Sequence, residues 1–97
     1  MAVRLVITIR AEPGKGAELA RAQAARCAEV QAEPGCEQYE IFRSELEPDK
    51  LVLLERWVDQ AALDAHAALN RTRPPLNPDL RAEGGAERED YEYSRVR

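Results

Sequence analysis

The chain has 97 residues, a formal net charge of -4 and 44% hydrophobic residues, which suits one small domain with a modest core. The acidic balance, without a basic stripe interleaved with aromatics, argues against nucleic acid as a partner, and no apolar run reaches the ~18 residues that span a bilayer. Two cysteines without metal-ligand spacing and the lack of an apolar leader predict a single cytoplasmic domain over residues 1–97.

The first half of the chain predicts a strand, a helix and a second strand. Residues 3–10 alternate with period two and are rich in β-branched side chains, as strands are. An alanine-rich amphipathic helix follows over about residues 16–33, with Glu33 among the charged residues on its solvent side. A Pro-Gly pair ends this helix, and residues 36–44, which include Tyr39, form the second predicted strand.

The second half predicts a strand, a helix and a last strand. Residues 51–57 form the third strand, and Asp59 is a suitable cap for a helix over residues 60 to about 69. Residues 70–86, rich in proline and glycine, are interpreted as irregular, and residues 88–96 as the fourth strand. The order β-α-β-β-α-β predicts an α+β, ferredoxin-like fold with a four-stranded antiparallel sheet.

The third strand indicates that the sheet is covered on both faces. Its residues 51–54 are all apolar, and residues 5–7 of the first strand repeat the pattern. A strand with one solvent-exposed face alternates apolar and polar residues, whereas a strand buried on both faces is apolar at consecutive positions. Two helices cover only one face of a four-stranded sheet, so we expect a homodimer with sheet packed on sheet. The alternative is that the irregular segment 70–86 covers the second face.

Two unique side chains gather between residues 55 and 66, at the junction of the third strand and the second helix. His66, the only histidine, allows three interpretations: a packed residue bonded to backbone, a base or hydrogen-bond partner facing a ligand, or a metal ligand. A single histidine without neighbouring cysteines or histidines is a poor metal site. Trp57, the only tryptophan, is either a core residue or a wall for a flat aromatic substrate.

Glu55 is the least expected residue on its apolar strand. A carboxylate there must be paired, hydrogen-bonded or protonated, so it forms an ion pair or serves as a base, and the ion pair is favoured. Three arginines on the predicted neighbouring strands can pair with it: Arg4, Arg10 and Arg43. The strand tyrosines are packing residues, any of which can reach a cavity and bond a substrate oxygen: Tyr39, Tyr91 and Tyr93.

The pattern Glu-x-Trp-x-Asp-x-x-Ala-Leu-x-x-His, from Glu55 to His66, resembles the antibiotic biosynthesis monooxygenase family. The first strand, the Glu-Pro-Gly turn at residues 12–14 and the Glu-Pro-Gly-Cys junction at residues 33–36 add to the resemblance. It implies a dimeric ferredoxin-like barrel with a cavity in each subunit. It also implies an activity of some members, the oxidation of quinols, anthrones or related polyketide aromatics by molecular oxygen, without a metal or flavin cofactor.

On this resemblance His66 is the base or orienting group, Trp57 the wall and Tyr39 a hydrogen-bond donor, with Glu55 also at the binding surface for a small aromatic ligand. Two alternatives are a non-catalytic, small-molecule-binding or stress-related barrel, and a haem-binding or haem-degrading relative. The haem-degrading branch uses an asparagine in the first strand, which this chain lacks. The proline- and glycine-rich residues 73–85 replace a helical stretch that is common in the family, so a different lid over the cavity is expected.

Overall fold

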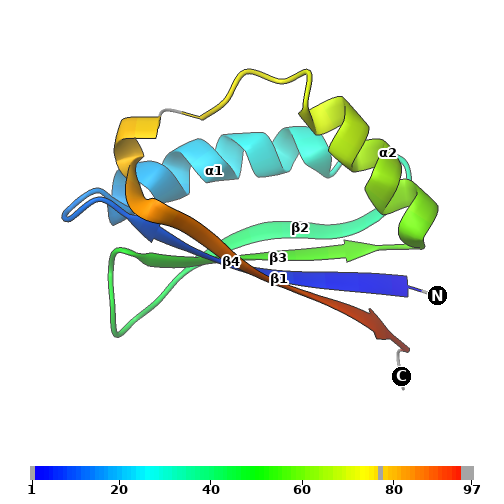
Figure 1. Cartoon of the computed structure of the whole chain (residues 1–97), viewed down its shortest axis with the longest axis horizontal. Helices are drawn as coiled ribbons and strands as arrows, with labels where there is room; N and C mark the ends of the chain where they lie inside the picture. Colours follow the sequence, from blue (N-terminus) through cyan, green and yellow to red (C-terminus); the bar gives the residue numbers. More distant parts are fainter. Residues whose placement is uncertain (1, 77, 95–97) are drawn as a thin grey trace.

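The computed structural model describes residues 2–76 and 78–94, and of residues 83 and 85 only the backbone. The elements follow one another as β1 (Ala2–Ala11), α1 (Gly16–Val30), β2 (Cys36–Arg43), β3 (Lys50–Trp57), α2 (Gln60–Asn70), the short 3₁₀ helix η1 (Pro78–Leu80) and β4 (Arg81–Tyr93). The strands pair antiparallel in the order β2-β3-β1-β4, and both helices lie on one side of the sheet (Figure 1). The prediction of an α+β, ferredoxin-like fold is confirmed.

The end of α1 differs from its prediction. The helix ends at Val30, three residues earlier than expected, and the amides of the next residues bond back over short turns. Glu33 therefore lies beyond the end of the helix, so the solvent exposure that was predicted from its position on the helix does not apply. Gly35 then adopts a positive φ of 80°, and a Cβ there would lie 2.6 Å from the Ala62 side chain, so the turn can press closely against α2.

The last strand begins earlier than predicted. Residues 81–86 were expected to be irregular, but they belong to β4, which pairs with β1 from Arg81 onwards. The register shifts between Ile9 and Ala11, which identifies a β-bulge, and Gly84 in the extra length of β4 has a positive φ of 102°. The glycines that suggested a loop therefore lie in a strand, at its bulge. The strand ends at Tyr93, and the last residues of the predicted strand lie outside the described residues.

The core lies between the helices and the inner face of the sheet. Along β3 the inward positions alternate strictly, from Leu51 to the fully buried Trp57. The helices contribute Leu19 and Val30 from α1 and Leu63 from α2, all 5% exposed or less. None of the described helices is long and apolar enough to cross a membrane.

The outer face of the sheet carries apolar side chains that no helix covers (Figure 1). Val6, Val52 and Leu54 on the two central strands are only half-buried. Phe42 and Tyr91 on the edge strands are 45% and 48% exposed. The consecutive apolar residues of the third strand are thus explained by a sheet with two apolar faces, one of which the described chain leaves open.

The segment between α2 and β4 lies on the helix side of the sheet. It runs above α1 before it reaches η1 (Figure 1). Residues 74–76 line a cavity together with Gln23 and Arg26 of α1. The alternative that this segment covers the outer face of the sheet is therefore wrong, because the segment lies against α1 on the opposite side.

Candidate functional site

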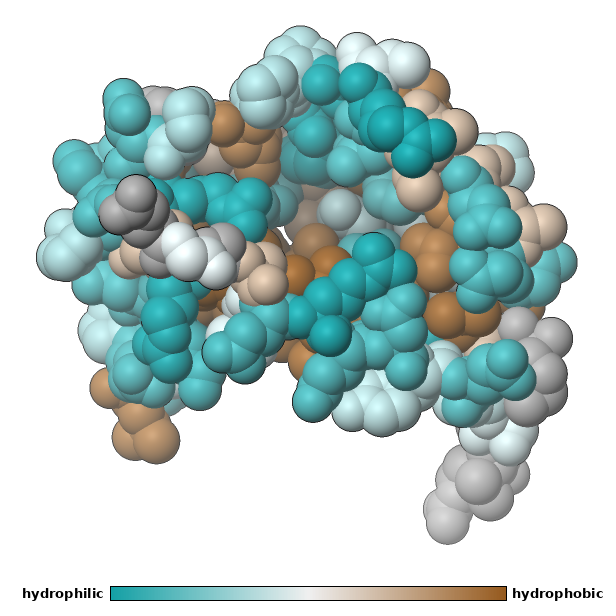
Figure 2. Space-filling model, viewed as in Figure 1, coloured by the Kyte–Doolittle hydropathy of each residue, from teal (hydrophilic) through white to brown (hydrophobic). Residues whose placement is uncertain are grey.

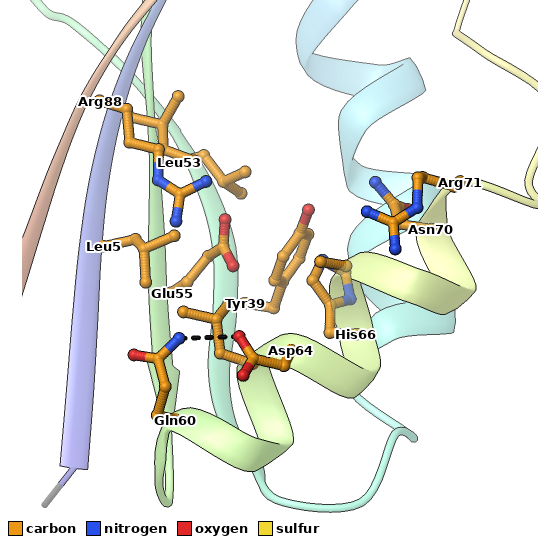
Figure 3. Close-up of a pocket in the computed structure, with 13 residues that line it drawn as sticks. Leu5, Tyr39, Leu53, Glu55, Gln60, Asp64, His66, Asn70, Arg71 and Arg88 are labelled. Atoms are coloured by element: carbon orange, nitrogen blue, oxygen red, sulfur yellow. Dashed lines mark hydrogen bonds between the residues drawn. The ribbon is translucent and has the colours of Figure 1, made fainter.

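A cavity of about 430 Å³ lies between α2 and the inner face of the sheet. Its floor is formed by the apolar side chains of Leu5, Ile7 and Leu53 from the central strands. Polar side chains stand around it: Tyr39, Glu55, Asp64, His66, Asn70 and Arg88 (Figure 3). In the space-filling view, a hollow with apolar residues at its base and hydrophilic residues at its rim is visible near the middle of the molecule (Figure 2). The cavity suits an apolar ligand with a few polar groups.

His66 is brought to the cavity by the way α2 begins. The carboxylate of Asp59 accepts a hydrogen bond of 2.8 Å from the backbone N–H of Ala62, as the predicted cap does. This start directs Leu63 and His66, three residues apart, toward the sheet, where both are buried. His66 thus has a fixed position on a rigid element, beside the ring of Tyr39 (Figure 3).

The partner of His66 is a carboxylate that the sequence interpretation placed in solvent. Nδ1 of His66 lies 3.0 Å from Oε1 of Glu33, whose side chain is only 8% exposed. The expected bond of a packed histidine to backbone is therefore not the contact that holds this ring. Because a carboxylate accepts hydrogen bonds, we assign the N–H of the imidazole to Nδ1, where it donates to Glu33. In this tautomer the lone pair lies on Nε2.

A third residue extends this contact. Nη1 of Arg73 lies 2.7 Å from Oε2 of Glu33, an ion pair that leaves this oxygen without a well-directed hydrogen bond. His66, Glu33 and Arg73 therefore form a continuous chain of charged or polarisable groups, in which an imidazole and a guanidinium flank one buried carboxyl group. One signal could have revealed Glu33: it precedes Pro34, and a residue before proline is disfavoured in a helix.

Two aromatic rings hold His66 from other sides. The indole of Trp57 stacks on the imidazole, with ring centroids 4.7 Å apart and an interplanar angle of 29°. Tyr39 lies at 5.4 Å and 59°. Trp57 is fully buried and is not part of the lining of the cavity. The structure thus places Trp57 in the core behind His66, in line with one of the two interpretations that the sequence allowed. The family resemblance had instead made it the wall that touches a substrate.

Glu55 does not form the ion pair that was predicted for it. Arg4 and Arg10 bond to Gln38 and Glu47 instead, because the even-numbered positions of β1 point away from the inner face. Its partner is Trp57, whose Nε1–H donates to Oε1 of Glu55 at 3.0 Å. The third candidate, Arg43, is exposed. Glu55 is thus a buried carboxyl that faces the cavity, and no cationic side chain among the described residues is bonded to it.

Burial raises the pKa of Glu55, and three weaker influences oppose this shift: the Trp57 hydrogen bond and the positive charges of His66 and Arg88. The folded protein therefore binds a proton on this carboxyl more tightly than the unfolded chain does. It follows that the free energy of unfolding decreases as pH rises above the ordinary carboxyl value of 4.5 toward the folded pKa. Glu55 is thus able to hold a proton under conditions where an exposed glutamate has lost it.

The substitution Glu55→Gln tests this assignment. Glutamine is neutral at every pH and its carbonyl can still accept from Trp57, so the variant is expected to gain stability relative to the wild type as pH rises from about 4.5 to about 8. Urea unfolding of both proteins across this range measures the difference. Stability curves that run parallel with pH would show that Glu55 titrates as an ordinary exposed carboxyl.

Tyr39 is the one tyrosine that reaches the cavity from the described strands. Its backbone carbonyl accepts a 2.9 Å hydrogen bond from Nε2 of Gln31, and its side chain is 95% buried at the cavity's edge. Burial, followed by the charge of Glu55, raises the pKa of the phenol above its usual range, so the hydroxyl stays protonated and can donate. Tyr91 and Tyr93 instead lie with Glu89 and Arg4 on the other face.

The sequence profile of the family described as antibiotic biosynthesis monooxygenase matches residues 2–72. The chain belongs to this family. The matched range includes Glu33, Tyr39, Glu55 and His66, so the cluster described above lies within the antibiotic biosynthesis monooxygenase domain. Arg73 and all of β4 lie beyond the match, and Arg73 belongs to residues 73–85, for which the sequence predicted a different lid.

Solved structures agree with this membership of the antibiotic biosynthesis monooxygenase family. PA3566 from Pseudomonas aeruginosa is 28% identical, with a TM-score of 0.78 over 97% of this chain and 95% of that chain. A conserved protein from Methanosarcina mazei Go1 is 26% identical, with a TM-score of 0.80 over 97% and 94%. A structure named antibiotic biosynthesis monooxygenase, 21% identical, shares the fold with a TM-score of 0.76 over 96% and 99%. Among curated proteins, none matches the chain significantly.

Within the described residues, no three His, Cys, Asp or Glu side chains are grouped as ligands of a metal ion would be. The nitrogen Nδ1 of His66 is already engaged by Glu33. The chemistry that the observed arrangement supports is proton transfer at Nε2 and hydrogen-bond donation by Tyr39, next to an apolar floor.

Proposed function

We propose that this chain is a cofactor-independent monooxygenase that oxidises a quinol-like or polycyclic aromatic substrate with O₂. The observation that carries the proposal is a buried histidine, held by Glu33 at Nδ1, at the edge of a largely apolar cavity that also contains Tyr39. An oriented imidazole with a free Nε2 is suited to take a proton from an acidic phenol or C–H group. Membership of the antibiotic biosynthesis monooxygenase family supports the same reaction class.

The proposed reaction begins with proton transfer from the substrate to Nε2 of His66. The neutral Tyr39 hydroxyl donates to the resulting enolate or phenolate oxygen, while the carboxylate of Glu33 stabilises the imidazolium. The electron-rich carbanion then reduces O₂ and combines with it to form a peroxide, which His66 protonates. For a methylene carbon, loss of water from the hydroperoxide leaves a carbonyl group. One oxygen atom is then in the product and the other in water, so no external reductant is required.

The experiment that tests this proposal is oxygen uptake by metal-stripped protein. The panel contains hydroquinones, dihydroxynaphthalenes and anthrones, with autoxidation subtracted from every rate. Protein-dependent uptake, with one O₂ consumed for each product molecule, supports the proposal. The absence of uptake across the panel, in protein that still binds these compounds, contradicts it.

A second candidate is a barrel that binds a small aromatic molecule without transforming it. The three aromatic rings of Tyr39, Trp57 and His66 pack on one another, and such packing stabilises a pocket whether or not chemistry occurs there. In this case the compounds of the panel quench the fluorescence of Trp57 without consuming oxygen. A Soret band after addition of haem would instead support the third alternative, a haem-binding relative.

We further propose that two copies associate through the open outer face of the sheet. Val6, Val52 and Leu54 form the centre of this face, with Phe42 and Tyr91 toward its edges. Burial of such a surface by a second copy is favourable by roughly 25 cal/mol for each Å² of apolar area. Gel filtration with light scattering is expected to give twice the chain mass of 10.9 kDa at micromolar concentration. A clean monomer at that concentration would contradict the proposal.

A further inference from the structure

A second cavity of about 290 Å³ adjoins the first one. It lies below the segment that follows α2, between α1 and the central strands. Four residues line both cavities: Ile7, Tyr39, Leu53 and Asn70. These shared residues place the two cavities side by side, as two chambers with Tyr39 at their boundary. The chamber that contains His66 is called the reaction chamber below, and the other the arginine chamber.

The arginine chamber differs from the reaction chamber in charge. Three arginines line it, one each from α1, the segment after α2 and the start of β4: Arg26, Arg73 and Arg81. No aspartate or glutamate belongs to its lining among the described residues. The reaction chamber, by contrast, is lined by the acidic side chains of Glu55 and Asp64 as well as by Arg71 and Arg88. The lining of the arginine chamber therefore has the larger excess of positive over negative side chains.

Two of the three arginines are held in place by other groups. The Arg26 side chain, 14% exposed, donates to the backbone oxygen of Pro74 at 2.6 Å. The Arg73 side chain, 15% exposed, pairs with Glu33 and more weakly with the exposed Glu29. Arg26 also lies 3.8 Å from the carboxylate of Glu29. These contacts fix both arginines, and the paired carboxylates offset much of their charge, so a ligand has to be met by the third arginine.

Arg81 is the arginine that is best placed to meet a ligand. Its side chain is half-buried in the chamber wall, and no ion pair joins it to another described residue. It begins β4 immediately after η1, opposite Ala11 of β1, so a sheet pairing fixes its backbone. A planar guanidinium in such a position can bind a carboxylate through two parallel hydrogen bonds.

We propose that the arginine chamber binds a carboxylate carried by the substrate, at the end remote from the reacting ring. This inference rests on the proposed function, since it names the class of substrate as an aromatic acid. A carboxylate at Arg81 directs the attached ring past Tyr39 into the reaction chamber, where His66 and Glu55 lie. Charge at one end and an apolar floor at the other thus set the direction in which a substrate enters.

The test compares two ligands that differ only in this charge. A naphthoquinone with a propanoic acid chain and its methyl ester are titrated into the protein by calorimetry, a measurement that needs no turnover. We expect the acid to bind wild-type protein at least about tenfold more tightly than the ester, because hydrogen bonds between charged groups are stronger than those between neutral ones. The preference is expected to decrease at high salt.

Substitutions then assign the preference to one residue. Arg81→Gln is expected to weaken binding of the acid to the level of the ester, while Arg81→Lys keeps part of the preference. The matched control is Arg21→Gln, which removes the same charge from an exposed position of α1 and is expected to change neither affinity. Circular dichroism verifies that each variant is folded. If Arg81→Gln does not fold, Arg81→Lys and the salt dependence of the wild type provide the comparison.

Three results would overturn the proposal: equal affinity of wild-type protein for acid and ester, an equal loss of both affinities in Arg81→Gln, and no binding of either ligand. Each is independent of the oxygenase reaction, because the quinone ligands are already oxidised. A preference for the acid together with an absence of oxygen uptake would refute the proposed function alone. Oxygen uptake without a preference for acids would refute the arginine chamber alone.

Discussion

Replacement of His66 by alanine is expected to lower kcat/KM for oxygen uptake by about 10²- to 10⁴-fold, the range that a general base contributes. The reason is that no other described side chain in the cavity combines a free basic nitrogen with an oriented second nitrogen. Alanine also removes the stacking partner of Trp57. Initial rates with the best substrate of the panel, corrected for autoxidation, measure the loss.

A second variant separates the base from its orientation. Glu33→Gln can still accept a hydrogen bond from Nδ1 of His66, but it lacks the charge that stabilises the imidazolium and pairs with Arg73. We expect an intermediate loss of about tenfold. The matched control is Glu45→Gln, a change at an exposed glutamate outside both cavities, and it is expected to be near the wild type. If His66→Ala unfolds the protein, or if His66→Gln and Glu33→Gln both retain full uptake, His66 is a structural residue.

The largest loss of stability is expected for Trp57→Ala, about 3–5 kcal/mol. The indole is fully buried, stacks on His66 and packs against Tyr39. Its removal opens a cavity in the core and also deprives the buried Glu55 carboxyl of the N–H that bonds to it. Urea unfolding, followed by far-ultraviolet circular dichroism because the variant has no tryptophan, measures the change.

Two further variants separate packing from the hydrogen bond at this position. Trp57→Phe retains much of the buried surface but has no donor for Glu55, so a loss of roughly 1–3 kcal/mol is expected. Leu46 is 92% exposed, and Leu46→Ala is expected to change stability by less than about 0.5 kcal/mol. A loss below about 1 kcal/mol for Trp57→Ala would contradict the view that this residue holds His66 and Glu55 in place.

The fold could be predicted from the sequence because apolar residues follow clear patterns along its helices and strands. The alternation of β1, the apolar run of β3 and the cap at Asp59 identified their elements almost to the residue. Local signals were less reliable where tertiary contacts decide the backbone. The glycines near residue 84 suggested a loop, but pairing with β1 makes this stretch a bulged strand.

The site was only partly accessible. His66, Tyr39 and Glu55 were recognised because they are unusual residues on periodic elements, and the structure brings all three to one cavity. The residues that hold His66 were not recognised, because both depend on where a non-periodic segment goes. Glu33 and Arg73 meet only after the chain leaves α1 and α2, and no local pattern encodes that contact.

The central claim, that the protein removes a proton from its substrate before oxygen reacts, can be measured without oxygen. An anthrone or dihydroxynaphthalene is mixed with the protein under anaerobic conditions, and its absorbance spectrum is recorded at a pH where the free compound is neutral. The account predicts the red-shifted spectrum of the substrate anion with wild-type protein and the neutral spectrum with His66→Ala. A bound substrate that remains neutral in the wild type, or an anion that persists without His66, would contradict it.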